Sequence, residues 1–151
     1  MPKLPSFAKA RGIAAIEFTL VAPFMLLLIF ATAEFGRLLY QYNALTNIVR
    51  DASRYMSDKA MSDNTGIPKV SDKLKSDTTK LIIAGGTTNE GEMLPGLTTA
   101  AITYDLSGEI VTITVSYDWT PIFADALFSF YNNPAISLNF PMVVSYSMRA
   151  S

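Results

Sequence analysis

The 151-residue sequence contains no cysteine and no histidine. Their absence excludes disulfides, thiolate nucleophiles, imidazole bases and the usual zinc ligands. Only 17% of the residues are charged, and the net charge is −1. Because basic and acidic residues are nearly equal in number, the chain lacks the excess of positive charge with which proteins bind nucleic-acid phosphates. We therefore expect no enzymatic activity, no metal, no cofactor and no nucleic-acid partner.

What the sequence has in excess is apolar side chains, which make up 50% of the residues. They are concentrated in residues 13–33, where 17 of 21 positions are apolar and Glu17 is the only charge. As a helix this segment spans about 31 Å, close to the hydrocarbon thickness of a bilayer. Lys3, Lys9 and Arg11 precede it without any acidic residue, so the positive-inside rule places the N-terminus in the cytoplasm. The segment is predicted to cross the membrane once.

Three interpretations of this segment remain open: a signal anchor, a removable secretory signal, and the start of a processed filament subunit. Ala31-Thr32-Ala33 matches the A-x-A pattern of a secretory cleavage site. Glu17 argues against that interpretation, because an acid near the bilayer centre costs about 2.5 to 3.5 kcal/mol on insertion scales and is usually paired and functional. Glu17 therefore needs a cationic partner.

The residues around Glu17 offer such a partner. From Arg11 to Phe18 the sequence reads Arg-Gly-Ile-Ala-Ala-Ile-Glu-Phe, and it resembles the class III signal of type IV pilins. The resemblance implies that a prepilin peptidase cuts between Gly12 and Ile13, and it assigns Glu17 and Phe18 to subunit assembly. After cutting, the Ile13 amine lies one helical turn from the Glu17 carboxylate. The two buried charges can then neutralise one another within a chain or between stacked subunits.

The resemblance becomes narrower downstream. Several separated stretches fall in one register and are similar to the TadE-like minor pseudopilins of tight-adherence (Flp, type IVb) pilus systems: residues 17–24, 34–40, 42–47 and 50–55. The similarity covers residues 11–56, about a third of the chain. It implies a minor pilin or pseudopilin that takes part in assembling such a pilus for surface attachment.

The resemblance also implies partners and a location. The partners are the prepilin peptidase, the major pilin and other minor pseudopilins, the inner-membrane assembly platform and membrane lipid. The chain is expected to be a single-pass inner-membrane protein with a cytoplasmic N-terminus and a periplasmic C-terminal domain, which could then be incorporated into the extracellular pilus. The alternative, from a different functional class, is a signal-anchored envelope protein with an extracytoplasmic binding or sensor domain.

Residues 13–60 are predicted to form one long helix. Beyond the membrane segment, apolar residues repeat at alternating steps of three and four: Phe35, Leu38, Tyr42, Leu45, Val49, Ala52 and Met56. This narrow apolar seam is expected to pack on the C-terminal domain. Pro23 removes the i to i−4 hydrogen bond to Thr19. Two interpretations of Pro23 stay open, a kink without consequence and a site where the helix unwinds locally in a filament.

The rest of the sequence predicts two further regions. Residues 61–100 read as a loop and a short amphipathic helix that stops at Gly85-Gly86. Residues 101–151 read as an antiparallel β domain, because apolar and polar residues alternate in three runs: 102–106, 111–119 and 136–148. Pro141 places the last strand at an edge or a bulge.

The predicted fold class is therefore α+β. A leader peptide of residues 1–12 precedes a long pilin-like helix whose first half is transmembrane and whose second half is amphipathic. The amphipathic half packs on a small antiparallel sheet.

Overall fold

The computed structural model describes most of the chain: residues 7–61, 67–88, 91–123, 126–127 and 136–150. Half of the expected leader, residues 1–6, lies outside the described residues. The chain divides into two compact units, Met1–Arg37 and Leu38–Ser151, called here the N-terminal unit and the C-terminal unit.

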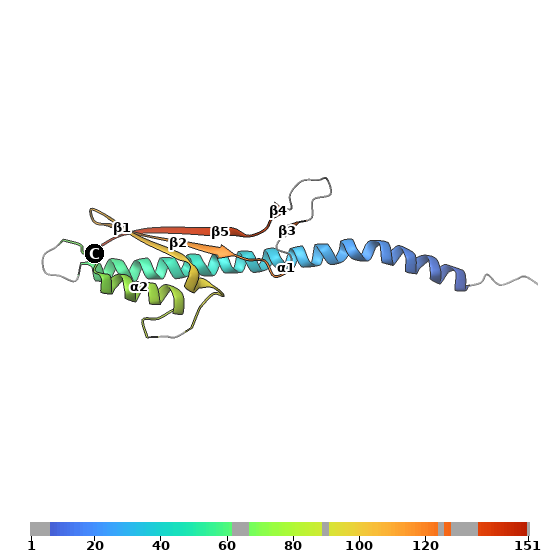
Figure 1. Cartoon of the computed structure of the whole chain (residues 1–151), viewed down its shortest axis with the longest axis horizontal. Coiled ribbons are helices and arrows are strands. Elements are labelled where there is room, and N and C mark those ends of the chain that lie inside the picture. Colours follow the sequence, from blue (N-terminus) through green and yellow to red (C-terminus); the bar gives the residue numbers. More distant parts are fainter. Residues whose placement is uncertain (1–6, 62–66, 89–90, 124–125, 128–135, 151) are drawn as a thin grey trace, which may run out of the picture. The chain divides into compact units, whose positions relative to one another are not determined.

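The longest element is helix α1, which extends over Phe7–Ala60 and passes from the N-terminal unit into the C-terminal unit (Figure 1). Its end agrees with the prediction, but its start lies six residues before the expected Ile13. The added turns contain alanine, lysine and arginine, which are among the strongest helix formers. The expected cleavage site between Gly12 and Ile13 therefore lies within a continuous helix.

In the N-terminal unit, the apolar side chains of α1 face outward. Every large apolar side chain from Ile13 to Phe30 is exposed, with Phe24 at 73% and Phe18 at 69%. Among the described residues, only helix α1 is long and apolar enough to cross a membrane. The most apolar stretch of α1 contains no buried residue. A continuous apolar surface of this kind needs lipid or other subunits to cover it.

In the C-terminal unit, α1 buries part of the predicted seam. Leu45, Val49, Ala52 and Met56 are fully buried, which confirms the seam over the second half of the helix. The seam is wrong at Phe35 and Tyr42, which are 62% and 45% exposed. At that level Gln41 faces the core instead of its neighbour Tyr42. The buried stripe turns around the helix as it follows a twisted sheet, so a fixed heptad does not describe it.

The predicted antiparallel sheet is present. It consists of β1 (Ala101–Ser107), β2 (Ile110–Trp119) and β5 (Phe140–Arg149), in the order β1-β2-β5. The central strand β2 buries alternate side chains as expected: Val111, Ile113, Val115, Tyr117 and Trp119. Pro141 lies opposite Asp118 on β5, which is an edge strand of the described sheet. This agrees with the position predicted from the missing N–H of proline.

The last strand is shorter than its alternating pattern indicates. The pattern begins at residue 136, but β5 begins at Phe140. Ile136–Ser137 instead forms β4, which pairs with β3 (Ala126–Leu127). The Ser137 hydroxyl accepts a hydrogen bond of 3.2 Å from the Asn139 backbone N–H. Such local bonds favour a turn over a continued strand.

The predicted short helix is α2, which covers Asp72–Ala84. The Ser71 hydroxyl caps its start by accepting a bond of 3.2 Å from the Leu74 N–H. Gly85 ends it in the left-handed conformation at φ +73°, with its N–H bonded to Leu81. The prediction that this glycine stops the helix is confirmed.

One hydrophobic core holds the C-terminal unit together. The sheet and α2 both lie alongside the second half of α1 (Figure 1), and all three contribute side chains to the same buried cluster. The Ser57 hydroxyl of α1 donates to the Arg149 carbonyl of β5 at 2.8 Å. The hydroxyls of Thr79 on α2 and Tyr104 on β1 lie 2.7 Å apart. The fold is α+β, as predicted.

Candidate processing and assembly site

The residues predicted to act in processing and assembly all lie on α1. Gly12, Ile13, Glu17, Phe18 and Pro23 occupy three successive turns of its exposed apolar part. Residues i and i+4 share a helix face, and each Cα–Cβ bond tilts toward the helix N-terminus. The Glu17 side chain therefore leans toward Ile13, about 6 Å back along the axis. The fold brings the carboxylate and the expected new N-terminus together through helix geometry alone.

Glu17 is an acid within an apolar helix face. Its side chain is exposed, and it forms no ion pair with any residue that the structure describes. Its neighbour Phe18 is exposed as well. A carboxylate in apolar surroundings is stabilised when a cation pairs with it. Among the side chains that the structure describes, none occupies Glu17 as such a partner.

Gly12 occupies a helical position with open space around it. A Cβ built there meets no atom within 4 Å, so packing within this chain does not require glycine. Glycine inside a helix costs about 1 kcal/mol relative to alanine. Gly12 therefore weakens the helix beside the expected scissile bond, where a protease needs an extended backbone.

A cut after Gly12 changes the backbone chemistry of the next turn. In the intact helix, the N–H groups of residues 13–16 have carbonyl partners in residues 9–12. Cutting removes those carbonyls and leaves four unpaired donors together with a new ammonium group. Positive charge at a helix N-terminus is unfavourable, and an acid in the first turn offsets it. Glu17 stands where that compensation is needed.

The helix continues through Pro23, which lies inside α1. Because proline has no N–H, the Thr19 carbonyl lacks its helical donor. The Thr19 hydroxyl is turned back and donates to the Ala15 carbonyl at 2.8 Å. Pro23 therefore weakens α1 six residues beyond Glu17 without ending the helix.

One polar pair on α1 was not singled out by sequence reasoning. The Arg37 guanidinium contacts one Glu34 carboxylate oxygen through Nη2 at 2.5 Å and through Nε at 3.1 Å. Both side chains are partly buried. The available signal was two opposite charges at the i, i+3 spacing directly after an apolar run. Their pairing removes net charge at the end of the predicted membrane segment.

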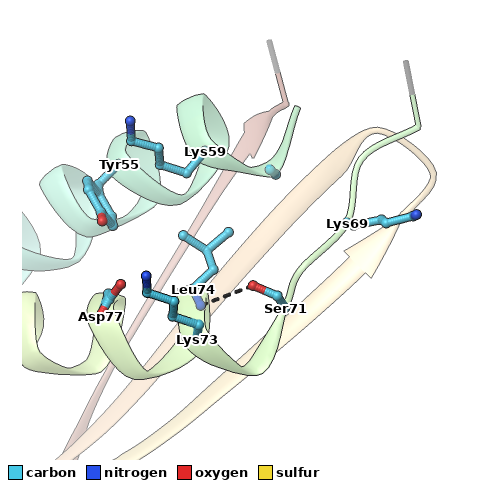
Figure 2. A pocket seen from close by; sticks show the side chains of 8 residues that line it. Tyr55, Lys59, Lys69, Ser71, Lys73, Leu74 and Asp77 are labelled. Carbon is cyan, nitrogen blue, oxygen red and sulfur yellow. Dashed lines mark hydrogen bonds between the residues drawn. The ribbon is translucent and has the colours of Figure 1, made fainter. Parts of the chain in front are cut away.

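A groove of the C-terminal unit lies between the end of α1 and the start of α2 (Figure 2). It measures about 410 Å³, and its lining includes three lysines: Lys59, Lys69 and Lys73. Lys69 points away from the other labelled side chains, and the Ser71 hydroxyl is used in capping α2. Ligand sites need polar groups that converge, and the labelled lysines of this groove do not converge.

Comparison with known families gives a match to α1. The family model described as TadE-like protein matches residues 12–54. The match lies within α1 and begins at Gly12, so the resemblance expected from the sequence is confirmed for this segment. The sheet and α2 lie outside it. Neither the curated proteins nor the solved structures give a match.

Proposed function

We propose that this chain, whose N-terminal helix is TadE-like, is a minor pilin or pseudopilin that takes part in assembling a tight-adherence (Flp, type IVb) pilus for surface attachment. Its role is structural rather than enzymatic. The observation that carries the proposal is the TadE-like match on a helix whose large apolar side chains from Ile13 to Phe30 are all exposed. Such a helix needs lipid before assembly and apolar neighbours in a filament afterwards.

In this proposal the subunit passes through two states, first in the membrane and then in the filament. In the first, α1 crosses the inner membrane once, with the N-terminus cytoplasmic and the C-terminal domain periplasmic. A prepilin peptidase then cuts between Gly12 and Ile13 and removes the leader of residues 1–12, including its basic residues. In the second, the inner-membrane assembly platform transfers the subunit from lipid to the major pilin and other minor pseudopilins. Pro23 is proposed as the site where α1 can unwind during this transfer.

Glu17 is proposed to act at the transfer step. In the membrane its carboxylate can sit near the interface or take a proton. In a filament core it is shut away from water and needs a cation, for which the Ile13 amine of its own or an adjoining subunit is the candidate. Removing one member of a buried ion pair costs about 3 to 5 kcal/mol. That free energy corresponds to a more than hundredfold change in an equilibrium constant.

The test compares Glu17→Gln with Leu20→Met on the same exposed part of α1. The glutamine variant keeps the size of the side chain and removes its charge, while the methionine variant keeps an apolar side chain of similar volume. Immunoblots of membrane and sheared-filament fractions measure incorporation. We expect both variants to be cut, Leu20→Met to be incorporated like the wild type, and Glu17→Gln to fall by about a hundredfold or more in the filament fraction.

Equal incorporation of the two variants would show that Glu17 is a tolerated interfacial acid. An uncut wild-type chain that stays in the membrane fraction would instead favour the alternative, a signal-anchored envelope protein with a binding or sensor domain.

A further inference from the structure

The exposed aromatic side chains of the C-terminal unit are unevenly distributed. Among its described residues, four aromatic side chains are exposed: Tyr40 at 71%, Tyr42 at 45%, Phe123 at 54% and Phe140 at 44%. The first two lie near the start of the unit on α1, and the others lie beyond β2 and at the start of β5. The other aromatic side chains that are described in the C-terminal unit are buried or half-buried.

The fold brings these two groups to the same level of the C-terminal unit. The bond from Ser57 to the Arg149 carbonyl fixes the end of β5 beside the last turns of α1. The nine steps from Arg149 back to Phe140 span about 30 Å, which equals about 20 residues of helix. Figure 1 shows β5 and the second half of α1 running side by side. Phe140 therefore lies level with the helix near Leu38.

The strand register places the end of β2, and the residues that follow it, beside Phe140. Phe140 pairs with Trp119, and the ring centroids of the two side chains are 5.3 Å apart. Trp119 is buried, so it forms a fixed support beneath the half-exposed Phe140 ring. Ile122 and Phe123 follow directly and are 69% and 54% exposed. Leu39, Tyr40 and Tyr42 of α1 are exposed at the same level, on different sides of the helix. The exposed residues at this level are called here the aromatic rim: Leu39, Tyr40, Tyr42, Ile122, Phe123 and Phe140.

We propose that the aromatic rim binds the interface of the lipid bilayer that anchors the chain, so that before assembly the C-terminal unit rests on the membrane surface. The inference depends on the membrane anchoring of the proposed function and adds a lipid-binding surface to it. Leu39 follows Ala33, the end of the predicted membrane segment, by six residues of continuous helix, or about 9 Å. The headgroup layer beyond the hydrocarbon is about 5 to 7 Å thick on each side, so the Leu39 backbone lies just outside it. Helical side chains lean toward the helix N-terminus, which directs those of the rim residues on α1 back toward the lipid.

The chemistry of the rim fits this occupant. Tyrosine is enriched at membrane interfaces, because its ring enters the apolar layer while its hydroxyl stays hydrated. Phe123 and Ile122 add apolar area without any charge. No charged residue belongs to the rim itself.

The opposite end of the C-terminal unit has a different character. Glu109 and Arg149 form an exposed ion pair of 2.6 Å there, and the lysine-lined groove lies at the end of α1. Its exposed apolar residues are aliphatic: Ile67, Leu106 and Ile110. Lys59 follows Ala33 by 26 residues, about 39 Å of helix. Along α1, the rim residues Leu39, Tyr40 and Tyr42 therefore lie much closer to the end of the predicted membrane segment than Lys59 does.

The experiment uses the full chain in vesicles of phosphatidylethanolamine and phosphatidylglycerol. Trp119 is the only tryptophan, so Trp119→Phe gives a silent background in which Phe123→Trp reports from the rim. Ile67→Trp, at an equally exposed residue far from the rim, is the matched control, and Tyr40→Trp is a second reporter if Phe123→Trp does not fold. Quenching by lipids brominated near the headgroup is compared with flotation of the vesicles.

We expect the Phe123→Trp emission to be quenched at least threefold more than that of Ile67→Trp. Equal, weak quenching in both variants, with the chain floating with the vesicles, would show that the rim does not bind lipid, and it would leave the membrane anchoring of α1 intact. Concentration-dependent burial of Phe123→Trp without quenching would overturn lipid binding by the rim in favour of a second copy as the occupant. A chain that does not float with vesicles would contradict the anchoring as well as the rim.

Discussion

At the scale of single residues, two glutamates show how surroundings decide what a carboxylate does. Glu17 lies on an apolar helix face and has no ion-pair partner within the described structure. Glu92 lies in the loop before β1 and accepts hydrogen bonds from the Gly96 N–H at 2.8 Å, from the Thr98 N–H at 3.1 Å and from the Thr98 hydroxyl. The first carboxylate has no ion-pair partner among the described residues, whereas the second organises its own loop.

The loop held by Glu92 is predicted to loosen in acid. The Thr98 hydroxyl, followed by the Gly96 and Thr98 N–H groups, holds the pKa of Glu92 below its usual value of 4.5. Since the folded pKa is depressed, the stabilisation is complete above about pH 4.5 and disappears as the pH falls through the folded value. Amide hydrogen exchange at Gly96 and Thr98 should therefore accelerate at low pH beyond the intrinsic trend.

The variant Glu92→Gln removes the titrating group and should show fast exchange at Gly96 and Thr98 already at neutral pH. Glu109→Gln, an exposed acid on the β1–β2 turn, is the control and should leave those two amides unchanged. If Glu92→Gln kept the wild-type exchange profile across the pH range, the carboxylate would not be what orders the loop.

Sequence patterns found only one of these two residues. Glu17 is visible because it is a charge in an apolar run and because the stretch from Arg11 to Phe18 resembles a pilin signal. Glu92 lies in a glycine-rich loop, where no periodicity indicates which backbone N–H groups an acid will reach. The i, i+3 spacing of Glu34 and Arg37 indicates that the two side chains can pair. Their partial burial depends on tertiary structure, which the spacing does not show.

At the scale of elements, length and strength of pattern decided what could be predicted. The long helix, the hairpin of β1 and β2, and α2 with its stop at Gly85 each have several turns or alternations of sequence signal. Strands β3 and β4 have two residues each and offer no period to detect. The face that α1 buries was predicted only in part, because it depends on the twist of the sheet beneath it.

The turning of the buried stripe predicts unequal costs along one apolar seam. Leu45→Ala removes a fully buried side chain and should lower the free energy of unfolding by about 2 to 5 kcal/mol. Tyr42→Ala, at a seam position that is 45% exposed, should cost no more than about 0.5 kcal/mol in detergent. Chemical unfolding followed by circular dichroism measures both. Similar losses would mean that the heptad seam is buried along its whole length.

The C-cap of α2 predicts a second contrast, between two glycines with positive φ. Gly85 and Gly96 have φ of +73° and +80°, so alanine at either site should cost roughly 1 kcal/mol of backbone strain. A Cβ at Gly85 also meets the Met93 Sδ at 2.7 Å, whereas one at Gly96 meets nothing within 4 Å. Met93 is 53% exposed and its flexible side chain can shift, so Gly85→Ala should destabilise only slightly more than Gly96→Ala in the same unfolding measurement. Met93→Ala should remove the difference. Equal costs without Met93→Ala would contradict the packing of Met93 under the cap.

At the scale of the whole molecule, the chain combines two solutions to the burial of apolar surface. The C-terminal unit has a core of its own, built from α1, α2 and the sheet. The N-terminal unit leaves its large apolar side chains from Ile13 to Phe30 exposed. Composition and hydropathy made that division predictable, because residues 13–33 hold most of the apolar excess. The sequence alone could not say which apolar side chains of the C-terminal unit remain exposed. The aromatic rim consists of such side chains.

The central claim is that the chain is a precursor whose mature form begins at Ile13. Intact-mass analysis of the protein purified from membranes of its native host tests this most directly, with Gly12→Leu as the control. A Cβ at Gly12 meets no atom within 4 Å, so the leucine variant should fold, stay uncut and retain residues 1–12. The wild type should have lost them. A wild-type mass that includes residues 1–12, or one that begins at Glu34, would contradict the claim, the first in favour of a signal anchor and the second in favour of a secreted protein.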